Sequence, residues 1–313
     1  AGAEAAEVVV GSGSRLQVKV RAGQPELITE AQSKSLGLRV LRERCSALTY
    51  TSDFTDQGLR SFVDNAVALC RLSEPDPLNE LPGRDELLAK DAVLPELNLW
   101  DDRTPTLDAD YGLAQARACE AAALAVSDKL RPDHGATFSR HTGQSAFACA
   151  DKGGVLFAGA TRGTSQYLAV SVLCDDRDGK KRSGNQYTSN RFVAELASPE
   201  EVGRSAGQRA LGKLGAEKIA TCELPVIFEP EEAQSLLGLL AQLISGSAVY
   251  RKQTYLSEHE GQPIASELFN VVDDPLILGA AGSRPFDGEG LASRRNIVVE
   301  NGVLRTFKSE EHT

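Results

Sequence analysis

The feature that most constrains this fold is a change in the spacing of apolar residues after residue 135. From there to residue 174, apolar and polar residues alternate with a period of two, which is typical of half-buried β-strands. Strands are predicted at residues 136–140, 145–149, 155–160 and 166–174. The segments 151–154 and 175–179 between and after them are rich in Asp and Gly, which predicts tight turns. We therefore expect an antiparallel β-meander in the middle of the chain.

The N-terminal segment contains a second group of predicted strands, at residues 8–10, 17–21, 37–41 and 47–51. The run Gly11-Ser12-Gly13-Ser14 lies between the first two of them. A dinucleotide-binding loop would need a third glycine where Leu16 stands, and no helix pattern follows. We interpret the run as a hairpin turn.

Four segments have the apolar spacing of amphipathic helices. They cover residues 53–70, 109–127, 198–215 and 230–244, and a strand is predicted at 225–228 before the last of them. The apolar stripe of the first helix includes Leu69 and Cys70. Asp53 and Thr55 are both placed to cap the first helix, and Ser198 with Glu201 forms a capping box at the third. The helices and strands together predict an α+β fold.

A proline-rich stretch provides the clearest internal boundary. Residues 73–105 contain five of the 13 prolines together with many acidic residues, which favours an extended connection. We expect an N-terminal α+β domain over residues 1–200, a mixed sheet with flanking helices, with a possible sub-boundary at 73–105. A largely antiparallel, β-rich C-terminal domain is expected over residues 201–313. Because the 313 residues include no Met, we also expect the sequence to be partial.

Charge and apolar content exclude several classes of protein. With 34 Lys and Arg against 44 Asp and Glu, the net charge is −10, which is unfavourable for binding nucleic acid. The most apolar stretch, residues 235–244, is shorter than the roughly 20 residues that span a bilayer. Six scattered cysteines form no disulfide framework and indicate buried thiols in a reducing cytoplasm.

Acidic residues near the C-terminal end are the candidates for metal binding. Asp273, Asp274, Asp287 and Glu289 lie in Asp- and Gly-rich loops that could offer oxygen ligands to a divalent cation. The same residues are also typical of tight turns, which is the more ordinary interpretation. The four histidines are not spaced as zinc ligands on one helix face, and His259 is expected in a surface loop.

Several short runs occur in an order that resembles the TldD/PmbA family over nearly the whole chain. They are GLRV at 37–40, TSD at 51–53, RGTSQ at 162–166, DGKKRSG at 178–184, VDDP at 272–275, FDGEG at 286–290 and ENGVL at 300–304. TldD members carry an HExxxH zinc-peptidase motif on a C-terminal helix, and PmbA members, also called TldE, lack it. The corresponding helix here, residues 230–244, contains no histidine. The sequence thus resembles the PmbA/TldE type.

This resemblance implies a cytoplasmic protein that pairs with a TldD-type subunit to form a heterodimeric metallopeptidase for small or unfolded peptides, in a family with names tied to DNA gyrase modulation. Zinc and water activation would then belong to the partner, so no catalytic residue and no cofactor is assigned to this chain. We expect the strand at 166–174 to hold peptide by β-strand addition. Family members continue for roughly a hundred residues after residue 304, so we expect the C-terminal domain to be truncated.

Two other functions remain open on the sequence alone. The chain could be a self-sufficient homodimeric hydrolase that uses Asp273, Asp274, Asp287 and Glu289 with a divalent ion. It could also be a peptide-binding regulatory module without hydrolysis.

Overall fold

The computed structural model describes residues 2–89 and 92–307 of the chain. A six-stranded sheet with the order β3-β2-β1-β4-β5-β6 forms its centre. Its strands are β1 (Ala5–Arg21), β2 (Gln24–Arg42), β3 (Cys45–Thr51), β4 (Arg131–Asp151), β5 (Gly154–Asp175) and β6 (Lys181–Asn190). All five strand pairs are antiparallel, so the α+β class is confirmed while the expected mixed sheet is antiparallel instead.

The strands are much longer than the sequence pattern predicted. Gly11-Ser12-Gly13-Ser14 does not form a hairpin turn but lies inside β1, where it pairs with β2 on one side and β4 on the other. The polar run before residue 36 continues β2, and the predicted strands within 136–149 and within 155–174 join into β4 and β5. Hydrogen bonds from β2 and β4 hold the polar stretch of β1 extended, and hydrogen bonds from β1 hold that of β2, where local propensity alone would not.

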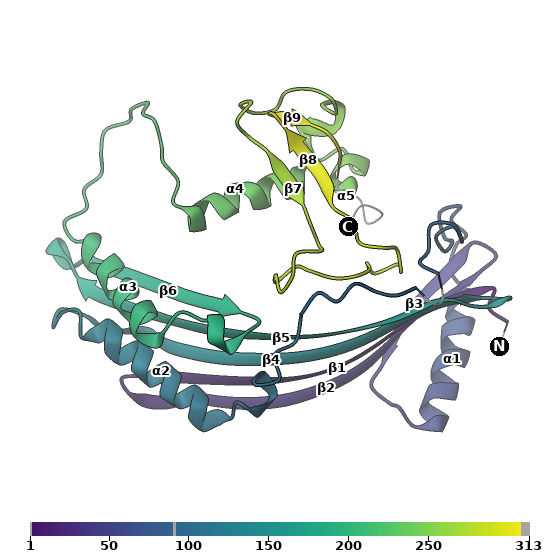
Figure 1. Ribbon diagram of the computed structural model, residues 1–313, viewed down its shortest axis with the longest axis horizontal. Helices are drawn as coiled ribbons and strands as arrows, with labels where there is room; N and C mark the ends of the chain where they lie inside the picture. Colours follow the sequence, from purple (N-terminus) through teal and green to yellow (C-terminus); the bar gives the residue numbers. More distant parts are fainter. Residues whose placement is uncertain (1, 90–91, 308–313) are drawn as a thin grey trace.

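Three helices cover one side of this sheet. They are α1 (Asp56–Cys70), α2 (Ala109–Leu124) and α3 (Pro199–Gly212). The sheet is curved, and these helices lie on its convex side (Figure 1). Thr55 accepts from the backbone N–H of Gly58, and Ser198 accepts from that of Glu201, so both predicted N-caps are confirmed. The α1 core differs from prediction, since Leu69 is half exposed whereas Val67 is buried.

Small residues allow α2 and α3 to pack closely against each other and against the sheet. A Cβ on Gly203 of α3 would lie 2.3 Å from the carbonyl oxygen of Cys119 on α2. A Cβ on Gly184 of β6 would lie 2.2 Å from the carbonyl oxygen of Ala206. Both distances are below any real contact, so glycine is required at these crossings. The main apolar core, including Phe138 and Leu168, lies between these helices and the sheet.

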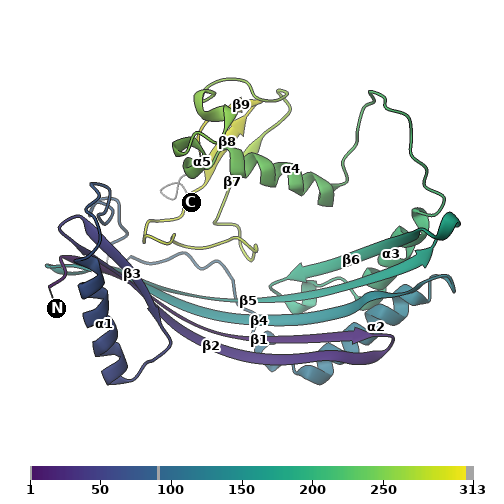
Figure 2. The same cartoon turned by 180° about the vertical axis from the view of Figure 1, so that it is seen from behind.

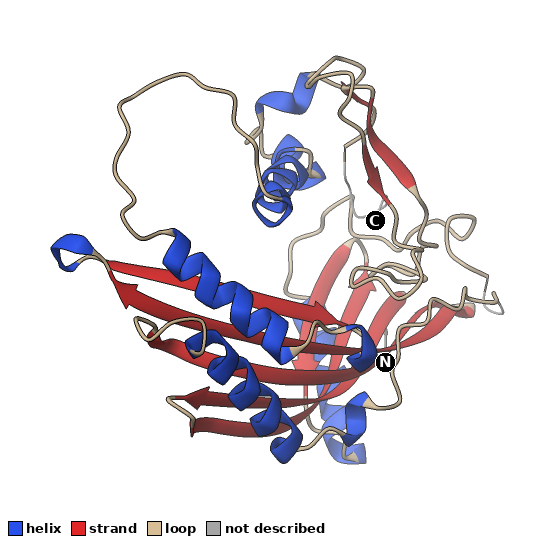
Figure 3. Ribbon diagram, turned by 60° about the vertical axis from the view of Figure 1, so that its left-hand side comes forward, coloured by secondary structure: helices blue, strands red, loops and turns tan. Residues whose placement is uncertain are grey.

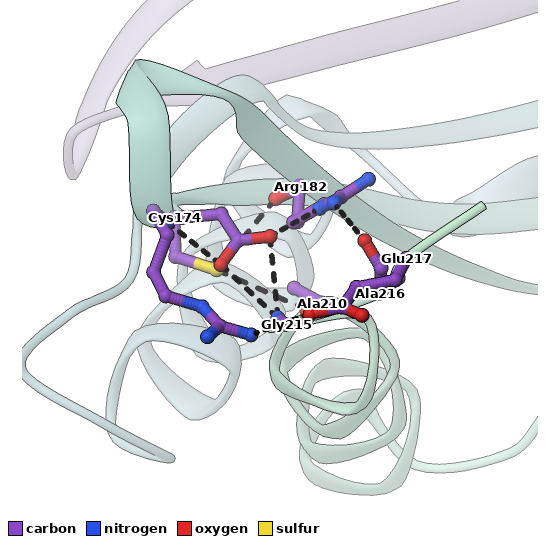
Figure 4. Close-up of polar contacts among 8 residues, drawn as sticks. Cys174, Arg182, Ala210, Gly215, Ala216 and Glu217 are labelled. Atoms are coloured by element: carbon purple, nitrogen blue, oxygen red, sulfur yellow. Dashed lines mark hydrogen bonds and ion pairs between the residues drawn. The ribbon is translucent and has the colours of Figure 1, made fainter.

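The C-terminal end of α3 is attached to the turn between β5 and β6 (Figure 4). Asp176 accepts hydrogen bonds from Arg182 Nε at 2.7 Å and from the backbone N–H groups of Gly215 and Arg177. These interactions, the Arg182 guanidinium first, lower the pKa of Asp176 to about 2. Gly215, with φ of +72°, lies two residues beyond the helix C-cap at Lys213.

The C-terminal segments lie across the concave side of the large sheet (Figure 2). They contain α4 (Pro230–Leu243), α5 (Gly246–Tyr250), β7 (Val271–Asp273), β8 (Asn296–Glu300) and β9 (Val303–Leu304). The last three strands form a small antiparallel sheet, and Ile244, Leu256 and Val299 form a core beside it. This part therefore has its own apolar cluster, separate from the core under the large sheet.

Two predictions about this region are wrong. Residues 225–228 were expected to form a strand, but they lie in an exposed segment that leads to α4 (Figure 3). The predicted apolar face of α4 is not buried: Leu236 and Leu237 are nearly half exposed, because no element of the described chain packs on them. Among the described residues, no helix is both long enough and apolar enough to cross a membrane.

The packing of α3 argues against the expected domain boundary at residue 200. Since α3 begins at Pro199 and packs on β5, β6 and α2, a division at residue 200 would cut through one packed unit. We propose that the division between the two parts lies in residues 213–229 instead.

Candidate functional site

A row of glycines crosses the concave face of the sheet. Gly13 of β1 is paired with Gly143 of β4, and Gly143 is paired with Gly163 of β5. On the next strand, Ser33 of β2 is paired with Gly13. The sheet thus presents bare backbone over three adjacent strands, where other side chains can lie flat.

Two side chains occupy the space that the glycines leave. A Cβ on Gly143 would lie 3.2 Å from Nε2 of His141, and one on Gly13 would lie 3.4 Å from its Cε1. A Cβ on Gly163 would lie 2.9 Å from Nη1 of Arg191. The imidazole and the guanidinium therefore rest against the glycine row from neighbouring positions.

Arg191 also fixes a loop of the C-terminal part. Its Nε donates to the carbonyl oxygen of Ala280 at 2.9 Å, and its Nη2 donates to that of Ala281 at 2.7 Å. Nη1 reaches the carbonyl oxygen of Thr164 at 3.4 Å. Burial lowers the pKa of Arg191, as expected for a charge removed from water. Its hydrogen-bond partners are neutral carbonyls, and this positive charge has no carboxylate in contact among the described residues.

The glycine row forms the floor of a cavity of about 960 Å³. Its walls come from β1, β2, β4, β5, the segment at Asn98 and Leu99, and the loop from Leu278 to Arg284. Of the charged side chains that line it within the described chain, Arg162, Arg191 and Arg284 are basic and Glu195 is acidic. Arg162 lies over the ring of Trp100, with 5.0 Å from its Cζ to the ring centroid. The cavity is thus basic in a chain whose net charge is −10.

The cavity continues along the sheet. At one end, a second cavity of about 240 Å³ shares His141, Ser165 and Ser189 with the first. The two cavities form an elongated site on one face of the sheet, lined mainly by small polar residues.

The predicted metal-binding carboxylates do not come together as a site. Asp287 is buried and its Oδ1 accepts from the backbone N–H groups of Glu289 and Leu291, both at 2.9 Å. Asp274 accepts from the backbone N–H of Leu276 and lies 3.8 Å from Arg295. These are turn-forming interactions, in agreement with the more ordinary interpretation of this sequence.

A metal ion is implied by the TldD/PmbA resemblance, and the residues of this chain do not fit one. Within residues 2–89 and 92–307, no group of three or more His, Cys, Asp or Glu side chains is arranged to hold a metal. His259 follows a short helical turn and meets Tyr255 edge to face, while His141 lies on the glycine row. His312 lies outside the described residues. Asp273 is at the end of β7.

The predicted site for β-strand addition is wrong. Residues 166–174 belong to β5, whose partners over this stretch are β4 on one side and β6 on the other. Both edges of the strand are therefore already paired, and no backbone groups are left to bind a peptide strand.

The sequence analysis missed the residues that form the cavity. His141, Arg162 and Arg191 are far apart in the chain and carry no shared motif. Gly13, Gly143 and Gly163 each fall between two predicted strands, so the sequence pattern indicates breaks there rather than continuous strands. Glycine within a strand marks close approach of another group.

Comparison with known proteins identifies related sequences along the chain. The family model for PmbA/TldA metallopeptidase domain 1 matches residues 6–70, and the model for the PmbA/TldA metallopeptidase C-terminal domain matches residues 221–313. The chain is 31% identical over 303 residues to the metalloprotease PmbA homolog of Haemophilus influenzae. It is also 31% identical over 301 residues to the metalloprotease PmbA of Escherichia coli O157:H7. Each match covers 96% of this chain and 65% of the relative, so the chain spans less than two thirds of those proteins.

Solved structures share the fold. A Bacteroides thetaiotaomicron protein described as a modulator of DNA gyrase superposes with a TM-score of 0.88 at 24% identity, over 98% of this chain and 68% of its own. TldE from Thermococcus kodakarensis superposes with a TM-score of 0.77 at 15% identity, over 98% of this chain and 66% of its own.

Proposed function

This chain belongs to the PmbA/TldD metallopeptidase family, and from that premise we propose that it is the PmbA/TldE-type subunit of a two-subunit peptidase. In this proposal a TldD-type partner holds the zinc ion, and this chain helps to bind small or unfolded peptides. The observation that carries the proposal is a large polar cavity in a chain whose described residues offer no metal-binding cluster. Binding and hydrolysis are then divided between two subunits.

The sequence of α4 supports this division. A zinc peptidase needs histidines one helical turn apart on one face, with a carboxylate beside them. The sequence of α4 is PEEAQSLLGLLAQL, which has acidic residues in its first turn and no histidine. Zinc would supply Lewis acidity and an activated water on the partner, so no step of hydrolysis is assigned to a residue of this chain.

Exposed apolar residues support a partner subunit. The segment before α4 and the helix itself expose large apolar side chains, namely Ile219, Leu224, Val226, Ile227, Phe228, Leu236, Leu237 and Leu239. Such a run is unfavourable in water and is typical of a surface that another chain covers. We propose a TldD-type subunit as the covering chain, with a second copy of this chain as the alternative.

The state of the cysteines supports a cytoplasmic location. All six are free thiols, and Cys70, Cys119, Cys149 and Cys174 are buried. A reducing compartment keeps such thiols unpaired.

Co-expression with a TldD-type subunit tests the proposal. We expect a stable complex that contains zinc and cleaves unfolded peptide, while this chain alone binds peptide without turnover. Leu237→Asp on α4 should weaken association by tenfold or more, because it places a charge in an apolar contact of about 1.5 to 3 kcal/mol. Gln234→Asp, on the same helix and also exposed, is the matched control and should have little effect.

Three outcomes would contradict the proposal. Failure to associate at micromolar concentration would contradict the subunit role. Stoichiometric zinc on this chain alone would contradict the division of labour. A zinc-containing complex that binds peptide without ever cleaving it would favour the regulatory module over the peptidase.

A further inference from the structure

The glycine row places two nitrogen-bearing side chains side by side at the floor of the cavity. His141 rests against Gly143, Arg191 rests against Gly163, and these two glycines are directly paired across β4 and β5. Paired positions in an antiparallel sheet lie about 5 Å apart, so the imidazole and the guanidinium are close enough to contact one small group together.

The positive charge at this floor comes from Arg191, which forms no ion pair with a carboxylate of the described residues, although Glu195 also lines the cavity. The contacts of Arg191 are the carbonyl oxygens of Thr164, Ala280 and Ala281. An anion that entered the cavity would therefore meet positive charge already removed from bulk water, where electrostatic attraction is stronger.

The elongated shape of the site indicates that the anionic group belongs to an extended chain. The cavity runs over the glycine row past His141 to the second cavity at Tyr167, and the glycines of the floor do not obstruct a bound backbone. Nucleic acid would require a long basic surface for its phosphates, and the net charge of −10 is unfavourable for that.

We propose that this cavity binds a carboxylate of an extended peptide, held by Arg191 and His141 on the glycine floor. The inference rests on the proposed peptide-binding role, and it specifies the carboxylate as the group of the peptide that the site recognises. A planar guanidinium matches the two oxygens of a carboxylate, and the imidazole can donate a further N–H. Both a C-terminal carboxylate and a Glu side chain provide this chemistry.

Direct binding to the chain itself, without the partner, tests the inference. Three fluorescent probes share one Ala- and Ser-rich sequence: one ends in a free carboxylate, one ends in an amide, and one ends in an amide but contains a Glu. We expect at least one carboxylate-bearing probe to bind about tenfold or more tightly than the neutral amide, with the difference shrinking as salt rises. The carboxylate probe that binds more tightly shows whether the site recognises a C-terminal carboxylate or a Glu side chain.

Single substitutions test which residues hold the carboxylate. His141→Gln should reduce the carboxylate advantage severalfold, whereas Arg162→Gln, at a position over Trp100 on the other face of β5, should leave it unchanged. Arg204→Gln, an exposed arginine on α3 behind the sheet, is the matched control and should leave it unchanged. Gly143→Ala, which would displace the imidazole, should reduce the advantage as well, and thermal unfolding of each variant shows whether it is folded.

Equal binding of the three probes would overturn the inference, as would an advantage that survives both His141→Gln and Gly143→Ala in folded protein. Displacement of the carboxylate probe by a single-stranded oligonucleotide at lower concentration than by free peptide would overturn it too, in favour of a nucleic-acid site. If the partner complex cleaves peptide but the probes bind equally, the subunit role stands and only the carboxylate site fails.

Discussion

The carboxylate of Glu120 on α2 accepts a hydrogen bond of 2.7 Å from the backbone N–H of Gly23, at the tip of the hairpin between β1 and β2. Its other oxygen accepts from the N–H of Ala22 at 2.9 Å. Glu120 is 2% exposed, so the helix and the hairpin are joined by a buried, acceptor-only group. The contact fixes the hairpin over the convex side of the sheet.

Replacing this carboxylate should destabilise the fold. In Glu120→Gln, one oxygen becomes an NH2 group that faces a backbone donor, so one buried N–H loses its acceptor. We expect a loss of about 1 to 3 kcal/mol in the free energy of unfolding, measured by urea denaturation. Glu223→Gln, in an exposed segment, is the control and should change stability little. An equal loss in both variants would show that Glu120 does not act through these hydrogen bonds.

The crossing of α2 and α3 predicts opposite effects for two glycines of one helix. Gly203→Ala would place a Cβ 2.3 Å from the carbonyl oxygen of Cys119, and backbone cannot move away cheaply. We expect a loss of about 1 to 3 kcal/mol in the free energy of unfolding. Gly212→Ala has open space around it and should stabilise by about 0.4 to 1 kcal/mol through the unfolded state. Thermal and urea unfolding of both variants measure the two changes in stability. Changes of the same sign would show that α2 and α3 are not in close contact at Gly203.

The Asp176 interactions predict a dependence of stability on acid pH. Since folding lowers the pKa of Asp176 to about 2, below its ordinary value of 3.8, the stabilisation is fully present above about pH 4 and is lost as pH falls through 2. The urea midpoint of Asp176→Asn should therefore lie below that of the parent chain at pH 5, and the gap should narrow toward pH 2. Asp64→Asn, at an exposed position on α1, is the control and should show no such narrowing.

The Arg191 contacts predict the mobility of the loop over the cavity. Lysine has a single ammonium group and cannot reach the carbonyl oxygens of Ala280, Ala281 and Thr164 together. Arg191→Lys should therefore make cleavage by chymotrypsin after exposed Leu278 severalfold faster, because the loop opens more often. Arg162→Lys, which keeps all three of these contacts, should leave the rate unchanged.

Local patterns in the sequence were reliable where neighbouring residues decide the structure. The caps at Thr55 and Ser198 and the turn after Asp151 depend on side chains within a few residues, and all three were predicted correctly. The α+β class followed from the same patterns. Strand length was wrong, since Gly11 to Ser14 have turn propensity but are held extended by β2 and β4.

Local sequence patterns did not identify the candidate site. Four carboxylates near one another in the sequence, Asp273, Asp274, Asp287 and Glu289, suggested a metal site, but the two whose bonds are described form turns. The cavity instead combines residues from distant segments, and register alone aligns its three glycines. Register is a property of strand pairing, which a single sequence does not display.

The sequence by itself determined the helices and their N-caps, the α+β class, the family resemblance and the absence of a histidine pair on α4. Each of these depends on residue types and short spacings. Only the tertiary structure decided that His141 and Arg191 share one floor. That arrangement depends on three strands pairing in one register, with glycine at each crossing, and on a loop from the C-terminal part closing over them. Such contacts arise from packing between segments more than a hundred residues apart, where local propensity has no influence.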